Sequence, residues 1–215
     1  MIPVIHAVTT DEIVARPGFV ERAVGVMQAL GTRGAVQLRA PRTAGAKLYE
    51  IATTLSEQQA STGAWVVVTD RVDVAQAARA RGVQLTSRSM SVADALIVAP
   101  ALAIGASAHS IEEARTACEA RATWLVVGQL RDERRHVAGP RALRQLVAEC
   151  GAPVVIIGGV TPEHVPGLRD LGVYGVAAIR GIWEAERADD RAAAYLSAYD
   201  SSSSPTPSGR AGGMA

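Results

Sequence analysis

The amino-acid sequence predicts an α/β protein that folds as a single-domain (β/α)8 barrel of the TIM type. Eight short apolar runs alternate with segments of helical character, a pattern typical of a parallel sheet with crossover helices. Eight such units fit within about 200 residues, which suits a compact barrel. The alternative is a doubly wound open sheet, but the first predicted strand is not followed by the Gly-rich turn of that fold.

The first four predicted units follow one another at short intervals. Strands are expected where apolar and β-branched residues run together, at residues 4–8, 34–38, 64–68 and 82–85. Residues 9–11 should form a polar turn. Apolar residues at helical spacing predict helices over residues 17–30, 44–59 and 72–79.

The second four units carry clearer helix-start signals. Strands are predicted at residues 101–104, 123–127, 153–157 and 174–179. Ser91 should cap a helix that runs to residue 97, and Ser110 with Glu113 forms a capping-box pattern. Thr161, followed by Pro162, should cap another helix. Residues 129–136 are expected to form a charged loop, and helices are predicted over residues 140–150 and 187–199.

Composition limits the classes of function. The chain is 48% apolar and 20% charged, with a net charge of +1, so nothing favours a nucleic-acid or membrane partner. No apolar run approaches the length of a membrane span, and Cys118 and Cys150 are expected to be reduced thiols in helices. We therefore predict a cytoplasmic protein. Residues 1–199 should form the barrel, and residues 200–215 a flexible tail rich in Ser, Pro and Gly.

Two glycine-containing turns end the last two predicted strands. Gly158 and Gly159 follow one strand, and Arg180 and Gly181 follow the next. Such turns expose backbone N–H groups at helix starts, and barrels commonly bind phosphate after strands seven and eight. We predict a phosphate site at these four residues; the alternative is that the glycines only make turns.

Polar residues also end the other strands, where a barrel has its functional mouth. The predicted substrate-binding residues are Gln37, Arg39, Thr69, Asp70, Ser107 and Gln129, and His109 adds the one titratable imidazole of this ring. His6 is expected in the core, and His136 and His164 on the surface. No metal-spaced histidine pair or hydrolytic triad pattern is present, so no metal site is predicted.

These motifs resemble the thiamine phosphate synthase superfamily and, within it, the TenI-type thiazole tautomerases. The resemblance runs from residue 4 to residue 182, and four segments carry it: Gln37-Leu38-Arg39, the run from Asp70 to Ala75, Gly105 to Ser110, and Ile157 to Pro162. It implies the barrel fold and small phosphorylated ligands.

Departures from the synthase pattern favour the tautomerase branch. Pro41 stands where the synthases have a pyrophosphate-binding lysine, and Ser89 where they have a second magnesium aspartate. Thr69-Asp70 replaces their Asn-Asp pair, and residues 129–133 replace their lysine-containing loop after strand six. A departing pyrophosphate requires such cations, so their loss argues against the synthase reaction, although Arg131 or Arg134 could partly substitute for them.

The resemblance therefore implies an isomerase that aromatises a thiazole carboxylate phosphate by a proton shift, with His109 as the acid–base group. A structural or substrate-orienting His109 is the alternative. No cofactor is expected; Mg²⁺ is expected only for a synthase that joins thiazole phosphate to hydroxymethylpyrimidine pyrophosphate. A non-catalytic, phosphate-binding regulatory barrel is the third hypothesis. The expected partner is a small phosphorylated thiazole, and homo-oligomer formation is left open.

Overall fold

The computed structural model closes eight parallel strands into one barrel, in the order β1-β2-β3-β4-β5-β6-β7-β8. It describes residues 1–128 and 139–201. The strands are β1 (Ile5–Val8), β2 (Gly34–Leu38), β3 (Trp65–Thr69), β4 (Gly82–Leu85), β5 (Ala103–Ala108), β6 (Trp124–Val127), β7 (Val154–Ile157) and β8 (Gly175–Ala178). The pairing of β1 with β8 closes the ring. The predicted (β/α)8 fold is confirmed.

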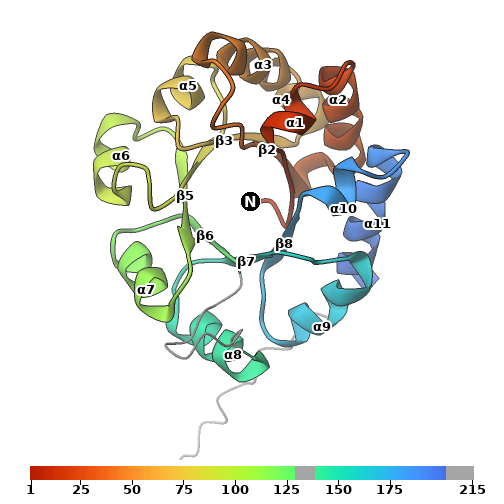
Figure 1. Ribbon diagram of the computed structural model, residues 1–215. Helices are drawn as coiled ribbons and strands as arrows, with labels where there is room; N and C mark the ends of the chain where they lie inside the picture. The colour runs from red at the N-terminus through yellow and green to blue at the C-terminus, as the bar shows by residue number, and fades with distance from the viewer. Residues whose placement is uncertain (129–138, 202–215) are drawn as a thin grey trace, which may run out of the picture.

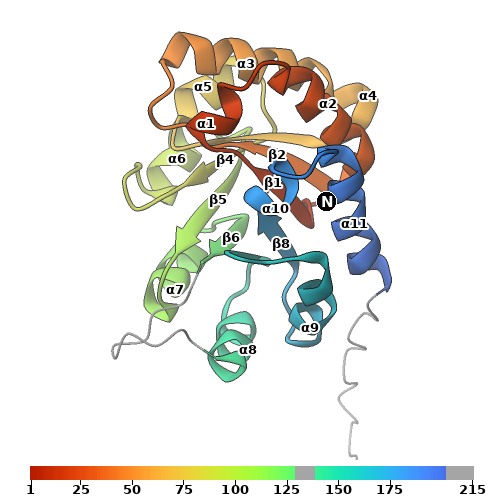
Figure 2. The same cartoon turned by 45° about the vertical axis from the view of Figure 1, so that its right-hand side comes forward.

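Helices surround the barrel, as Figure 1 shows in a view along its axis. They are α1 (Asp11–Val14), α2 (Phe19–Leu30), η1 (Gly31–Arg33), α3 (Gly45–Glu57), α4 (Gln59–Thr62), α5 (Val72–Ala77), α6 (Val92–Val98), α7 (Ile111–Glu119), α8 (Pro140–Glu149), η2 (Pro162–His164), α9 (Val165–Asp170), α10 (Arg180–Trp183) and α11 (Ala188–Ser201). Figures 1 and 2 both place α11 beside α2, so the two ends of the described chain pack together. No helix in these ranges has the length and apolar character needed to cross a membrane.

Serine caps fix the starts of two helices on the β5 side of the barrel, as predicted. The Ser91 hydroxyl accepts a hydrogen bond from the Asp94 N–H at 3.1 Å at the start of α6. The Ser110 hydroxyl accepts from the Glu113 N–H at 3.1 Å, and the Glu113 carboxylate accepts from the His109 N–H at 2.7 Å. The two bonds to serine each satisfy a backbone donor that the first helical turn leaves unpaired. The bond from the His109 N–H to the Glu113 carboxylate also fixes the backbone of His109.

Several predicted boundaries are corrected by the structure. The fifth strand was expected to end at residue 104 but continues to Ala108, because its inward residues line the barrel there. The one-turn helices α1 and α10 were missed, being too short for helical periodicity to be visible. The helix predicted over residues 44–59 is divided into α3 and α4, and η2 replaces the first turn predicted after Thr161.

The C-terminal helix also passes its predicted end at residue 199. Helix α11 continues through Ser201, so the first two residues assigned to the tail are helical. The rest of the predicted tail lies outside the described residues, as do Gln129, His136 and the charged loop between them.

Large aromatic side chains fill the interior of the barrel toward the amino ends of its strands. The Trp124 ring centroid lies 6.0 Å from that of His6 and 6.5 Å from that of Trp65. A Cβ added to Gly105 would lie 2.2 Å from Trp124 Cε2, so this strand position must be glycine for the indole to fit. The barrel is therefore solid below its mouth, as is typical of the fold.

His6 belongs to this packed interior, as predicted. Its side chain is fully buried, and Nε2 lies 3.1 Å from the Pro3 carbonyl oxygen, which makes that nitrogen the donor. Burial lowers the pKa of His6 to about 4, despite the opposing effects of the hydrogen bond to Pro3 and of the neighbouring Gln37 side chain. His6 is therefore neutral at pH 7 and serves the core. His164 is exposed on η2, also as predicted.

The two cysteines are free thiols, both half-buried. Cys118 lies in α7, and Cys150 directly follows α8. Burial, with the neighbouring Cys118 thiol, raises the pKa of Cys150 to about 12, so its thiol stays protonated near neutral pH.

Candidate active site

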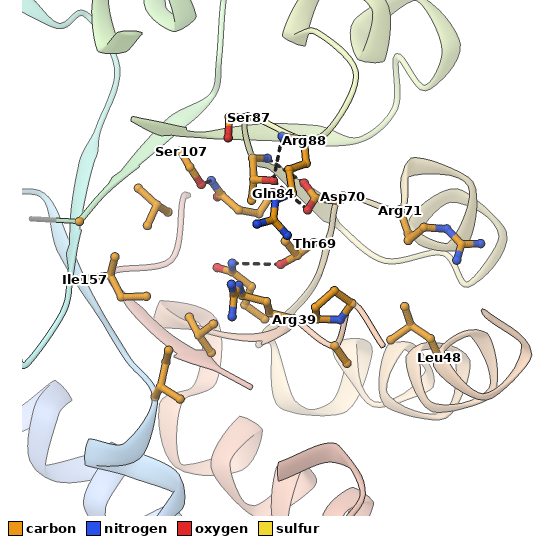
Figure 3. Close-up of a pocket in the computed structure, with 18 of the residues that line it drawn as sticks. Arg39, Leu48, Thr69, Asp70, Arg71, Gln84, Ser87, Arg88, Ser107 and Ile157 are labelled. Atoms are coloured by element: carbon orange, nitrogen blue, oxygen red, sulfur yellow. Dashed lines mark hydrogen bonds between the residues drawn. The ribbon is translucent and has the colours of Figure 1, made fainter. Parts of the chain in front are cut away.

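A pocket of about 560 Å³ opens at the carboxyl ends of the barrel strands. Each of the eight strands, or the loop that directly follows it, contributes to its lining, and Leu48 of α3 adds to it. Figure 3 shows these side chains converging from the barrel wall. The position is the one where TIM barrels hold their active sites. The predicted residues Gln37, Arg39, Thr69, Asp70, Ser107 and His109 all line it.

One half of the pocket, from β2 to β5, is polar. The Gln37 amide nitrogen donates to the Thr69 hydroxyl at 3.2 Å, and the Gln84 amide nitrogen donates to the Ser107 hydroxyl at 3.0 Å. The side-chain oxygens of both glutamines are buried and have no hydrogen-bond partner within the described residues. Buried acceptors without partners are costly, so these two oxygens are available to donors on a ligand.

The opposite half of the pocket is apolar. Val8, Val126, Ile157 and Ile179 come from β1, β6, β7 and the end of β8, and all four line the pocket. They follow the period of two along each strand that sets the inward face. A flat ring could pack against this wall while its polar atoms face β2 to β5. The sequence interpretation missed this wall, although alternation along the strands predicts it.

Two arginines reach into the pocket from neighbouring loops. Arg39 follows β2, where its backbone N–H donates to the Thr9 hydroxyl at 3.0 Å, and Arg88 lies in the loop after β4. Figure 3 shows both side chains directed into the pocket, whereas Arg71 points away and pairs with Asp73 at 2.7 Å. Within the described residues neither Arg39 nor Arg88 has an ion-pair partner. They make the polar half cationic.

Asp70 is a hydrogen-bond acceptor for the loop after β4. One carboxylate oxygen accepts from the Thr86 N–H at 2.8 Å, and the other accepts from the Thr86 hydroxyl at 2.9 Å. The backbone of Asp70 is left-handed, with φ of +61°. Asp70 therefore acts as a hydrogen-bond acceptor at the end of β3, and within the described residues it forms no ion pair with Arg39. Thr86 was not anticipated from the sequence.

The residues present do not fit a magnesium site built by the protein. Mg²⁺ demands near-ideal octahedral oxygen coordination and is usually held by one or two carboxylates together with substrate phosphates. Asp70 is the one carboxylate among the described pocket residues, and both of its oxygens already accept hydrogen bonds. In the described ranges, no three His, Cys, Asp or Glu side chains are grouped to hold a metal ion. Ser89, at the position of the synthases' second aspartate, adds only a hydroxyl.

His109 lies at the rim of the pocket, one residue beyond β5. Its side chain is exposed, and a Cβ added to Gly128 would lie 3.9 Å from its Nδ1 atom. The imidazole therefore reaches the gap between the ends of β5 and β6. This places His109 where it can contact a ligand.

The four residues of the predicted phosphate site lie next to the pocket rather than on its wall. Ile157 and Ile179 line the pocket, and the two predicted pairs follow them directly. Gly158 and Gly159 have φ of +117° and +65°, and no atom of the described residues lies within 4 Å of a Cβ added to either, so backbone conformation is what requires glycine there. Gly181 has a packing reason, because its added Cβ would lie 2.3 Å from the Tyr195 hydroxyl oxygen. Phosphate binding at these turns stays a prediction.

Comparisons with known proteins agree on one family. The family model described as thiamine monophosphate synthase matches residues 5–182. The thiamine-phosphate synthase of Pyrococcus furiosus is 37% identical over 160 residues, which cover 73% of this chain and 77% of that protein. The thiamine-phosphate synthase of Methanoculleus marisnigri is 33% identical over 181 residues, which cover 81% of this chain and 85% of that protein.

A solved structure gives the same relationship. The thiamine phosphate pyrophosphorylase of Pyrococcus furiosus superposes with a TM-score of 0.80 at 32% identity, covering 92% of this chain and 96% of that chain. The predicted thiazole tautomerase activity is wrong on these findings, because the relatives at 30–37% identity are named thiamine-phosphate synthases. The tautomerase prediction rested on lost lysines and a lost aspartate and took no account of Arg88.

Proposed function

We propose that this chain, which belongs to the thiamine monophosphate synthase family, is an enzyme of thiamine biosynthesis that makes thiamine phosphate. The reaction joins thiazole phosphate to hydroxymethylpyrimidine pyrophosphate. The thiazole ring nitrogen forms a bond to the methylene carbon of the pyrimidine. The carbon–oxygen bond to pyrophosphate breaks, and its electron pair leaves with the pyrophosphate. The step needs no oxidant, and it requires no proton transfer at the reacting atoms.

The division of the pocket into two unlike halves is the observation that carries this proposal. Two flat heterocycles suit the apolar wall formed by Val8, Val126, Ile157 and Ile179. The charge that develops on a departing pyrophosphate suits the cationic half, where Arg39 and Arg88 enter. The free oxygens of Gln37 and Gln84 can accept hydrogen bonds from an aminopyrimidine ring.

The remaining predicted residues take roles that follow from their positions. The turns after β7 and β8, with Gly158, Gly159 and Arg180, are proposed to hold the phosphate of the thiazole substrate. His109 contacts a ligand at the rim and positions it, since this reaction needs no acid–base group on the ring. Ser107 supports Gln84 through the hydrogen bond described above.

The proposal is tested by incubating the purified chain with both substrates and detecting thiamine phosphate by mass spectrometry. Arg39→Met should lower kcat/KM about 10- to 100-fold, because it removes hydrogen bonds to a charged group. Arg42→Met is the matched control. It lies in the same loop outside the pocket and pairs with Asp11 and Glu12, so turnover should stay within about twofold.

Two outcomes would contradict the proposal. If no thiamine phosphate forms with or without Mg²⁺, the chain is not a synthase. If Arg42→Met lowers turnover as much as Arg39→Met does, general charge rather than the pocket governs the rate, and the assignment of the cationic half fails.

A further inference from the structure

The loop after β4, residues 86–89, carries the Arg88 guanidinium into the pocket. Thr86 anchors the loop by donating twice to Asp70, at 2.8 and 2.9 Å. The Ser89 N–H donates to the Thr86 carbonyl oxygen at 3.0 Å and closes a turn around Arg88. The Arg88 N–H also donates to the Thr86 hydroxyl at 3.4 Å.

This geometry gives Asp70 a role in presenting Arg88. The carboxylate directs both oxygens at Thr86, two residues before Arg88. The turn then directs the Arg88 side chain into the pocket, as Figure 3 shows. A carboxylate used in this way stabilises the loop that carries a cation. Asp70 is also the one carboxylate among the described residues that line the pocket, so a divalent metal ion would find no second protein carboxylate there.

Arg88 and Arg39 also differ from the other arginines around the mouth. Arg71 and Arg42 are each paired with nearby carboxylates. Within the described part of the chain, the two pocket arginines have no such partner, so their charges remain available to an anion. Guanidinium groups present several N–H donors in a rigid plane that matches phosphate oxygens.

We propose that Arg88, together with Arg39, binds the pyrophosphate group and neutralises it as it departs, in place of a magnesium ion. The inference rests on the proposed synthase function and deepens it. Bond making and breaking are those given above, and the arginines stay protonated throughout. The enzyme should therefore form thiamine phosphate without a divalent metal.

Calorimetry with inorganic pyrophosphate tests the binding site directly. The protein is first dialysed against EDTA, and the titration is run with EDTA present. The wild type should bind pyrophosphate, and Arg88→Ala should weaken the affinity about 10- to 100-fold. Arg71→Ala removes the same charge from a residue that points away, so its affinity should stay within about twofold. Circular dichroism checks that each variant is folded, and Arg88→Lys should recover part of the affinity by restoring the charge.

Turnover in EDTA and in millimolar Mg²⁺ separates this inference from the proposed function. Similar rates in both conditions, with a large loss in Arg88→Ala, support it. Thiamine phosphate formed only with Mg²⁺ leaves the synthase function intact and overturns the role of Arg88, as does pyrophosphate binding that needs Mg²⁺. If no thiamine phosphate forms in either condition, the proposed function fails, and calorimetry alone decides whether Arg88 forms a metal-free pyrophosphate site.

Discussion

Removing either partner of the Asp70–Thr86 pair should destabilise the fold and loosen the loop that carries Arg88. Asp70 accepts two hydrogen bonds, from the N–H and the hydroxyl of Thr86. Hydrogen bonds to charged groups contribute about 1.5–3 kcal/mol when well buried, and Asp70 is half-buried, so we expect about 1 kcal/mol for each. Thr86→Val removes the hydroxyl bond alone and should lower the free energy of unfolding by about 1 kcal/mol.

Two substitutions of Asp70 separate the effects of hydrogen bonding and backbone conformation. Asp70→Ala loses both hydrogen bonds and places alanine at φ of +61°, so it should lower the free energy of unfolding by about 2–3 kcal/mol. Asp70→Asn keeps one good acceptor and a residue that tolerates this conformation, so about 1 kcal/mol is expected. The double variant of Asp70→Ala with Thr86→Val should lose about 1 kcal/mol less than the sum of the two single losses.

Urea denaturation at pH 7 measures all four variants against the wild type, with calorimetry of pyrophosphate binding as the second readout. Strictly additive losses would show that the two residues do not interact. If Asp70→Ala leaves stability unchanged but abolishes Mg²⁺-dependent pyrophosphate binding, Asp70 is a metal ligand, and the reasoning given for the loop is refuted.

Three further predictions concern the core and the phosphate turns. The pKa of His6 is about 4 in the folded chain and 6.5 in the unfolded chain. The unfolded chain therefore binds a proton first as pH falls, so the stabilisation that neutral His6 gives the fold is fully present above pH 6.5 and is lost as pH falls toward 4. The free energy of unfolding should fall by about 2 kcal/mol between pH 7 and pH 5 for this reason, and a His6→Gln variant that keeps the full slope would contradict it. Gly105→Ala should lower the free energy of unfolding, measured with urea, by at least about 1–3 kcal/mol, because its Cβ would meet Trp124 at 2.2 Å. Gly25→Ala is the control: its Cβ would make an ordinary contact at 3.7 Å in α2, so the free energy of unfolding should not fall. Equal losses in the two variants would refute the packing argument. Arg180→Ala should weaken thiazole phosphate binding by about 1.5–3 kcal/mol, and unchanged affinity in calorimetry would remove Arg180 from the site.

The sequence contained enough information to predict the barrel and most of its elements. Continuous apolar runs identify buried parallel strands, and the bounds of β2 and β4 match the prediction. Ser91 and Ser110 provide local signals that do not depend on tertiary contacts, so both caps are found. The end of β5 was missed because Gly105 looks like a turn residue, whereas its role is to accommodate Trp124 from the next strand.

The candidate site was predicted in part because strand ends in a barrel converge. Gln37, Arg39 and His109 line one pocket for this reason. Contacts between loops have no comparable sequence signal, so neither the Asp70–Thr86 pair nor the direction of Arg88 could be predicted. The tautomerase interpretation was wrong for a related reason. It counted the synthase ligands that this sequence lacks, and such a count does not show which other side chains reach the pocket, as Arg39 and Arg88 do.

The proposed metal-free synthase reaction is tested most sharply by a ³¹P NMR time course of the EDTA-dialysed enzyme with thiazole phosphate and hydroxymethylpyrimidine pyrophosphate. We predict that thiamine phosphate and pyrophosphate appear together in equal amounts without added metal, and that Arg88→Ala slows both about 10- to 100-fold. Substrate resonances that remain unchanged until Mg²⁺ is added would contradict the metal-free mechanism, and resonances that never change would contradict the synthase function itself.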